Sequence, residues 1–327
     1  MTPETAGAYL RARGLVPGGS PARVRALSGG ISNIVLRVDW DGGAVVVKQS
    51  LPMLRVDAAW PFDPRRVLTE CECLRTLGDL LPAGAVPRVL DVDADLLAFT
   101  MTCAPDNGTV WKDALLRGEV DLAVARRAGV LLATVHRRSA LDGAIRDRFA
   151  DLMPLIEGRT EPYHRTAAAA HPDLAPLIAG DVERLMTQRR ALVLGDFSPK
   201  NLVVYADHVL ALDFEVAHWG DPAFDAAFLL AHLVGKSVHM AASADLYLAA
   251  ARAFWAAYRN AAGEEGAAGA DTATELAVLL LCRVDGKSRL EYLNAAECAR
   301  LRALARELIA APVANPEALL DAVAKAL

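Results

Sequence analysis

The sequence predicts an α+β protein with two lobes, the first small and β-rich, the second larger and mainly α-helical. Short β-branched runs separated by glycine turns fill the first hundred residues, and Ala- and Leu-rich segments with helical spacing fill most of the rest. The length of 327 residues is sufficient for two domains. We expect an N-terminal lobe over residues 1–101, a hinge over 102–107 and a C-terminal lobe over 108–327.

Composition limits the class of protein. Hydrophobic residues make up 54% and charged residues 23%, so a large core can be buried. With 35 basic and 40 acidic residues and no basic block, the chain is not expected to bind nucleic acid. It contains no bilayer-length apolar run, signal-peptide pattern or C-x-x-C pair. These absences predict a cytoplasmic protein with reduced thiols and no membrane partner. The chain is expected to be a monomer or a homodimer.

In the first lobe a helix is predicted over Pro3–Arg13, followed by strands at Val24–Leu27 and Ile34–Val38. The turn between the strands contains Gly29, Gly30 and Ser32. Backbone N–H groups in such a turn can approach an anion, although an ordinary hairpin has the same composition.

The rest of this lobe should consist of one more strand, a helix and a final pair of strands. Lys48 alternates out of the β-branched run Ala44–Gln49, and by composition alone it would be a solvated edge residue. The apolar residues of Pro64–Leu80 fall at three- and four-residue spacing, which predicts a helix with Glu70 beside its apolar stripe. Arg88–Asp91 and Leu96–Met101 are predicted to be the last strands.

The second lobe shows a series of amphipathic segments. His136 ends the first stripe and is interpreted as a structural histidine. Gly220-Asp221-Pro222 is typical of a helix start, and Asp225 lies in the first turn that follows. The other predicted helices cover Asp121–Arg138, Asp173–Arg190, Met240–Ala262, Thr272–Val284, Ala295–Ala311 and Pro316–Leu327.

The chemistry is expected in the stretch from Leu192 to Asp225. Two short apolar runs there predict a hairpin turned at Ala206-Asp207. If Tyr205 pairs with His208, Asn201 at the start of the first strand lies next to Asp213 at the end of the second. An amide oxygen and a carboxylate so placed suit Mg²⁺ in a phosphoryl-transfer site.

Asp196 precedes Asn201 by five residues, on a turn that would lift its carboxylate toward this metal. Isolated aspartates are usually turn or cap residues, but here the whole constellation occurs in strand and loop context. The runs G-D-F-S-P-K-N, L-D-F-E and G-D-P-A-F-D resemble the aminoglycoside phosphotransferase and choline kinase family, small-molecule relatives of the protein kinases. This resemblance implies a bilobal protein-kinase-like fold.

The resemblance also implies roles for particular residues. Asp196 would be the base for a substrate hydroxyl, and Asn201 and Asp213 would hold Mg²⁺. Lys48 would reach the phosphates of ATP. Glu70 would pair with this lysine, with Glu72 as the alternative because the sequence does not fix the rotation of the helix.

The resemblance also implies where the nucleotide binds, and at one position this chain departs from the family. Adenine would bind the backbone around Met101 and Cys103, and the turn with Gly29 and Gly30 would approach its phosphates. The segment V-K-Q-S-L-P and the later W-P resemble methylthioribose kinase, over roughly residues 29–74 only. Where the family usually has a backbone-supporting histidine, this chain has Leu194.

These features predict an ATP-dependent phosphotransferase that acts on a hydroxyl of a sugar, an amino alcohol or an aminoglycoside-like compound. An inactive nucleotide-binding relative with a regulatory role is the alternative. The acceptor is expected near Arg283 and Asp285, where a charged stretch follows the apolar run Leu276–Leu281. A solvated helix end would give the same pattern.

Overall fold

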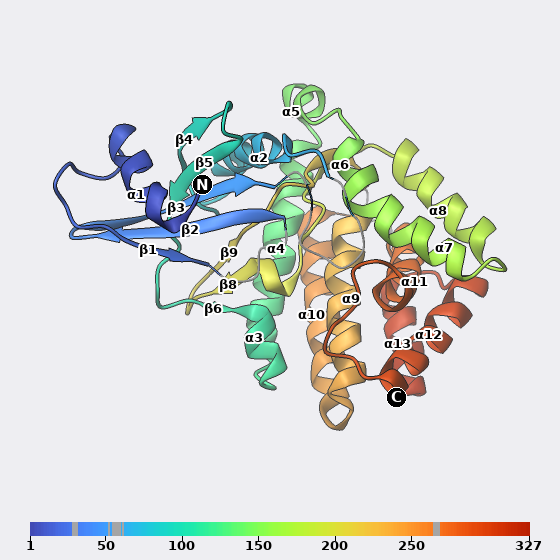
Figure 1. The fold of residues 1–327 in the computed structure, drawn as a ribbon. Coiled ribbons are helices and arrows are strands. Elements are labelled where there is room, and N and C mark those ends of the chain that lie inside the picture. Colours follow the sequence, from blue (N-terminus) through green and yellow to red (C-terminus); the bar gives the residue numbers. More distant parts are fainter. Residues whose placement is uncertain (28–31, 52, 54–59, 61, 264–268) are drawn as a thin grey trace. The chain divides into compact units, whose positions relative to one another are not determined.

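The computed structural model describes the whole chain except residues 28–31, 52, 54–59, 61 and 264–268. The chain divides into two compact units, Met1–Asn107 and Gly108–Leu327. The first unit carries an antiparallel sheet and the second is mainly helical, as Figure 1 shows. This is the expected α+β class. No helix in the described part of the chain has the length and apolar character needed to cross a membrane.

The sheet of the first unit has five strands in the order β1-β2-β3-β5-β4. Strands β2 and β3 form a tight hairpin in which Trp40 pairs with Gly43. Helix α1 precedes β1 in the sequence, and helix α2 follows β3. The bounds are α1 Pro3–Ala12, β1 Arg23–Ala26, β2 Asn33–Trp40, β3 Gly43–Ser50, α2 Arg66–Leu80, β4 Val89–Asp93 and β5 Ala98–Thr102.

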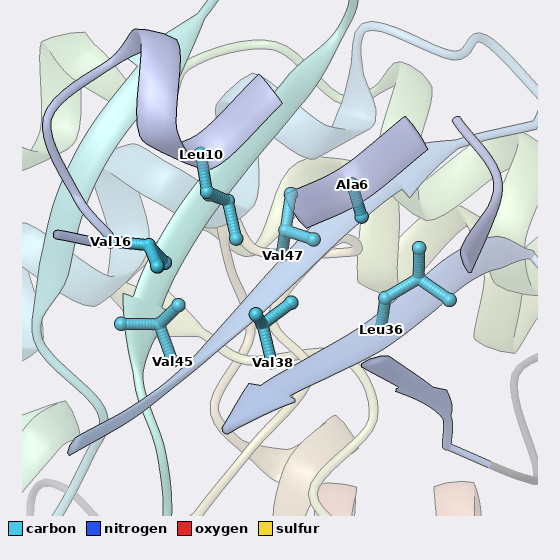
Figure 2. Close-up of a cluster of buried hydrophobic side chains, with 7 residues drawn as sticks. All are labelled: Ala6, Leu10, Val16, Leu36, Val38, Val45 and Val47. Atoms are coloured by element: carbon cyan, nitrogen blue, oxygen red, sulfur yellow. The ribbon is translucent and has the colours of Figure 1, made fainter. Parts of the chain in front are cut away.

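One face of this sheet packs against α1. The period of two along a strand places alternate side chains on the same face, so Leu36 and Val38 of β2 lie on one face. Val45 and Val47 of β3 share that face, and all four are at most 4% exposed. Figure 2 shows this cluster, which is completed by Ala6, Leu10 and Val16. Its burial holds the hairpin that carries Lys48.

Helices form the framework of the second unit. Helix α9 is buried from Ala223 to Val238, and α4 packs along α10. At this crossing the backbones are so close that a Cβ on Gly129 would lie 2.4 Å from the carbonyl oxygen of Phe254. The main helices are α3 Trp111–Leu116, α4 Leu122–Ser139, α8 Ala175–Thr187, α9 Ala223–His239, α10 Ala244–Ala262, α11 Gly269–Asp285, α12 Ala295–Ala310 and α13 Pro316–Ala326.

Two small sheets in this unit carry the stretch singled out in the sequence. Strand β7 (Ala191–Val193) pairs with β10 (His218–Gly220). Strands β6 (Thr109–Val110), β8 (Leu202–Val204) and β9 (Val209–Ala211) form the other sheet.

The segment between α4 and α8 forms helices that the sequence did not predict. They are α5 Gly143–Arg148, α6 Met153–Leu155, the ten-residue π-helix η1 Ile156–Arg165 and α7 Thr166–Ala170. Helix η1 contains Pro162 and packs against α8 and α11. A π-helix of this length is rare, and such helices occur frequently at functional sites.

Candidate active site

Asp225 anchors the loop that carries Asp196. Its side chain is fully buried and accepts hydrogen bonds from the backbone N–H groups of Leu194, at 2.6 Å, and Gly195, at 2.8 Å. His136 lies beside it, with Nε2 3.2 Å from Asp225 Oδ2 and Nδ1 2.8 Å from the hydroxyl of Tyr258. Asp225 therefore holds the loop backbone, and His136 is a structural histidine, as predicted.

The loop itself turns sharply at Gly195. This residue has φ +76°, a left-handed conformation that glycine adopts without strain. Asp196 follows, is 8% exposed, and lies among cations: its Oδ2 is 3.0 Å from Lys200 Nζ and 3.2 Å from Arg159 Nη2. Ser198 Oγ is 3.4 Å from its Oδ1.

Asn201 lies immediately before β8, opposite the end of β9, as predicted. Strands β8 and β9 pair in the expected register, and the N–H of Leu212 donates to the carbonyl of Asn201 at 2.9 Å. The amide nitrogen of Asn201 donates to the carbonyl of Asp196 at 3.0 Å. The amide oxygen is therefore directed away from that contact, and it is the atom that could serve as a metal ligand.

Asp213 follows this hairpin in an uncommon backbone conformation. Its φ of +68° is in the left-handed region, which few non-glycine residues adopt. Such conformations cost roughly 1–3 kcal/mol and concentrate at functional sites. Asp213 is the residue that follows Leu212, whose backbone is hydrogen-bonded to Asn201. A carboxylate and an amide oxygen are hard ligands, and this pair fits Mg²⁺.

Arg159 is a member of the site that the sequence reasoning missed. It lies in η1, is 5% exposed, and donates through Nε to the carbonyl of Gly195 at 2.6 Å. Nothing in the sequence around it marks a functional residue, since it is a single arginine separated from Asp196 by 37 positions. Only the packing of η1 brings its guanidinium to the loop.

The two cations beside Asp196 stay charged. Desolvation opposes the positive charge of Lys200, but Asp196 and Asp213 outweigh it, so the pKa of Lys200 is raised. The same balance raises the pKa of Arg159, where burial opposes the charge and Asp196 is the largest favourable contribution. The site thus combines the carboxylates of Asp196 and Asp213 with the cations of Arg159 and Lys200. Positioned charges of this kind can stabilise a phosphoryl group.

In the first unit, Lys48 forms a buried ion pair with Glu70. Lys48 Nζ lies 2.6 Å from Glu70 Oε2, and the two side chains are 7% and 2% exposed. Glu72 instead forms an exposed pair with Arg75 at 2.7 Å. The rotation of α2 therefore selects Glu70, the first choice of the two acids.

The other predicted nucleotide-binding residues are also in the first unit. Gly29 and Gly30 lie outside the described residues. Ser32 is buried, and its carbonyl accepts from Leu51 N at 3.0 Å and from Arg66.

The proposed adenine contacts are at the end of β5. Met101 is 8% exposed and pairs with Val46 of β3. Cys103 follows the strand, and burial raises the pKa of its thiol.

The two residues predicted to bind the acceptor have different surroundings. Arg283 is 6% exposed, and its Nη1 donates to Tyr163 Oη at 3.0 Å and to the carbonyl of Ser288 at 2.6 Å. Asp285, at the end of α11, accepts two hydrogen bonds of 2.7 Å from Arg302 and lies 2.8 Å from His171 Nε2. The side chain of Asp285 thus connects α11 to α12.

Comparison with known proteins identifies the family. The sequence profile of the phosphotransferase enzyme family matches residues 23–264, most of the chain. The chain belongs to this family. Methylthioribose kinase 1 from Oryza sativa subsp. japonica is 25% identical over 239 residues, which cover 64% of this chain and 55% of the relative. The chain thus spans only a little over half the length of that relative.

Two solved structures share the fold of this chain. An amicoumacin kinase in complex with AMP-PNP, Ca²⁺ and Ami has a TM-score of 0.57 at 16% identity, over 95% of each chain. A choline/ethanolamine kinase family protein from Mesorhizobium loti has a TM-score of 0.53 at 16% identity, over 98% of this chain and 93% of that one. At this level of identity the similarity shows a kinase-like fold, in agreement with the prediction.

Proposed function

We propose that the protein transfers the γ-phosphate of ATP to a hydroxyl group of a small molecule. The observation that carries the proposal is the loop from Asp196 to Asn201, which folds back so that the amide of Asn201 bonds the carbonyl of Asp196. This loop brings a carboxylate, a metal-type amide oxygen and the lysine Lys200 into one short turn. Membership of the phosphotransferase enzyme family supports the same reaction class.

In this proposal Asp196 accepts the proton of the substrate hydroxyl as it attacks the phosphorus. The nearby guanidinium of Arg159 holds the carboxylate and the loop carbonyl in place. Lys200 lies 3.0 Å from the same carboxylate and can neutralise charge on the transferred phosphoryl group. Orientation and charge stabilisation are the main contributions a protein makes to phosphoryl transfer.

Asn201 and Asp213 would hold Mg²⁺, which when bound neutralises charge on the β- and γ-phosphates of the nucleotide. In the first unit, the pairing of Lys48 with Glu70 would direct the lysine ammonium to the α- and β-phosphates. The backbone around Met101 and Cys103 would bind adenine, and the backbone at Ser32 would approach the phosphates.

The test is the substitution Asp196→Asn, with Asp207→Asn as a control. Asp207 lies at the exposed tip of the same hairpin, so its change leaves the loop intact. ADP release is measured with Mg²⁺ and a panel of sugars, amino alcohols, aminoglycosides, methylthioribose and hydroxy acids. Loss of a general base should lower turnover by about 10²–10⁴. ATP affinity, measured by calorimetry, should change little because the base contacts the acceptor.

Near-normal turnover of the Asp196→Asn variant would reassign the base. A wild-type protein that binds ATP but releases no ADP with any compound would contradict the proposed activity.

A further inference from the structure

One face of α9 carries a row of side chains at a spacing of four residues. Phe228, His232 and Lys236 therefore lie above one another on the helix. The rings of Phe228 and His232 meet edge to face, with centroids 5.3 Å apart. At the other end of the row, Lys236 Nζ lies 5.0 Å from the centre of the Tyr292 ring. The row thus continues onto the segment after α11.

This row begins beside Asp196. The guanidinium of Arg159, which contacts Asp196, also lies over the ring of Phe228 at 5.2 Å. Arg283 lies over the same ring at 5.9 Å. The next side chains of the row, His232 and Lys236, follow about one and two helical turns farther along α9.

The row on α9 and the side chains of Arg283 and Tyr292 beside it include polar atoms without a hydrogen-bond partner among the described residues. They are Arg283 Nε, His232 Nε2, Lys236 Nζ and Tyr292 Oη. Arg283, His232 and Lys236 are 6%, 7% and 0% exposed. A buried donor left unpaired costs about 1–3 kcal/mol, and more if it is charged. Four such atoms from neighbouring side chains are therefore unusual unless a ligand satisfies them.

The charge of this cluster is positive. Lys112 is close enough to affect Lys236, but its own ammonium is paired with Glu291. Burial, followed by the charges of Lys112 and Arg283, lowers the pKa of Lys236 to about 7, although the carboxylate of Glu291 acts in the opposite direction. Burial, followed by the charges of Arg283 and Lys236, lowers the pKa of His232 well below its usual value. A negative ligand group would relieve this repulsion.

We propose that Arg283, His232, Lys236 and Tyr292 form an anion subsite that binds an oxyanion of the acceptor, a carboxylate or a phosphate ester. The inference rests on the proposed function and narrows it: the acceptor is a hydroxyl compound with a negative group. Its hydroxyl would lie at Asp196 and its oxyanion at the anion subsite. An amino alcohol or an aminoglycoside would place an ammonium group against like charges. Asp285, bonded to Arg302 and His171, has no part in this subsite.

The experiment uses compounds that differ in charge on one carbon skeleton. Glycerol, threitol and glucitol are each compared with the corresponding acid, phosphate ester and amine. Binding is measured by calorimetry with ADP and Mg²⁺ present, and transfer is measured as ADP release from ATP. We expect at least one anionic compound to exceed both its alcohol and its amine by 10-fold or more. Comparison of acids with phosphate esters decides which oxyanion is used.

The variant Lys236→Met tests the assignment to this cluster. Methionine fills a similar volume without charge, and Lys325→Met, at an exposed lysine of α13, is the control. We expect the Lys236 variant to raise the acceptor KM at least 10-fold with the ATP KM unchanged. If this variant fails to fold, Tyr292→Phe removes a single hydroxyl and should raise the acceptor KM several-fold.

The proposal is overturned if the alcohols or amines are preferred, if no anionic compound binds, or if the variants that fold keep the wild-type acceptor affinity. Failure of the proposed function gives a different result. Anionic compounds would then bind in a Lys236-dependent manner with no release of ADP.

Discussion

Substitution of Asp225 by asparagine should loosen the loop that carries Asp196. The carboxylate uses both oxygens: Oδ2 accepts from Leu194 N at 2.6 Å and Oδ1 accepts from Gly195 N at 2.8 Å. An asparagine side chain has only one oxygen, so its NH₂ group must face a backbone N–H or the ring of His136. Hydrogen bonds to a charged group contribute about 1.5–3 kcal/mol each. With one bond lost and the other weakened, the free energy of unfolding should fall by about 2–4 kcal/mol.

Urea unfolding followed by circular dichroism measures this change, and ADP release measures its effect on the loop. A displacement of about 1 Å at reacting groups can cost about 10²-fold in rate, so turnover should fall by about 10–100-fold. Asp245→Asn is the control, because Asp245 is an exposed residue in the first turn of α10. A loss of stability below about 0.5 kcal/mol, the range of ordinary surface substitutions, with unchanged turnover would refute the anchoring role of Asp225.

Three further predictions concern the metal, pH and the loop. Asp213→Ala should weaken Mg²⁺-dependent ATP binding more than Asn201→Ala, since a carboxylate carries a charge opposite to that of the metal. Titration of both variants with Mg²⁺ tests this order, and equal losses of ATP affinity would contradict it. Burial lowers the pKa of Lys236 from 10.5 to about 7. At pH values between these two numbers the unfolded chain therefore binds one more proton than the folded chain. Stability should therefore rise with pH, by about 2 kcal/mol from pH 7 to 9. Urea unfolding should show that Lys236→Met removes this rise, and an identical slope in both proteins would be evidence against it. Gly195→Ala should lower the thermal midpoint, because φ is +76° and a Cβ would lie 2.8 Å from the carbonyl oxygen of Val216; an unchanged midpoint would mean that the loop adapts.

Local patterns in the sequence were sufficient for much of the candidate site. The pairing of β8 with β9 depends only on a turn and two short apolar runs, so the contact between Asn201 and Leu212 could be worked out from residue numbers alone. The strand that carries Lys48 could be recognised because a period of two marks strands. The choice between Glu70 and Glu72 needed the structure, since their helix positions differ by only two residues and the packing of α2 fixes its rotation.

The sequence by itself determined the α+β class, the hairpin with Asn201 and the loop with Asp196, because short-range spacing and turn chemistry encode them. Only the tertiary structure brought Arg159 to that loop, since its position depends on the packing of η1. The anion subsite has the same origin. Sequence reasoning identified the start of α9, whereas the burial of Lys236 follows from the packing of other segments around this helix. Burial depends on contacts between distant segments, which local patterns do not encode.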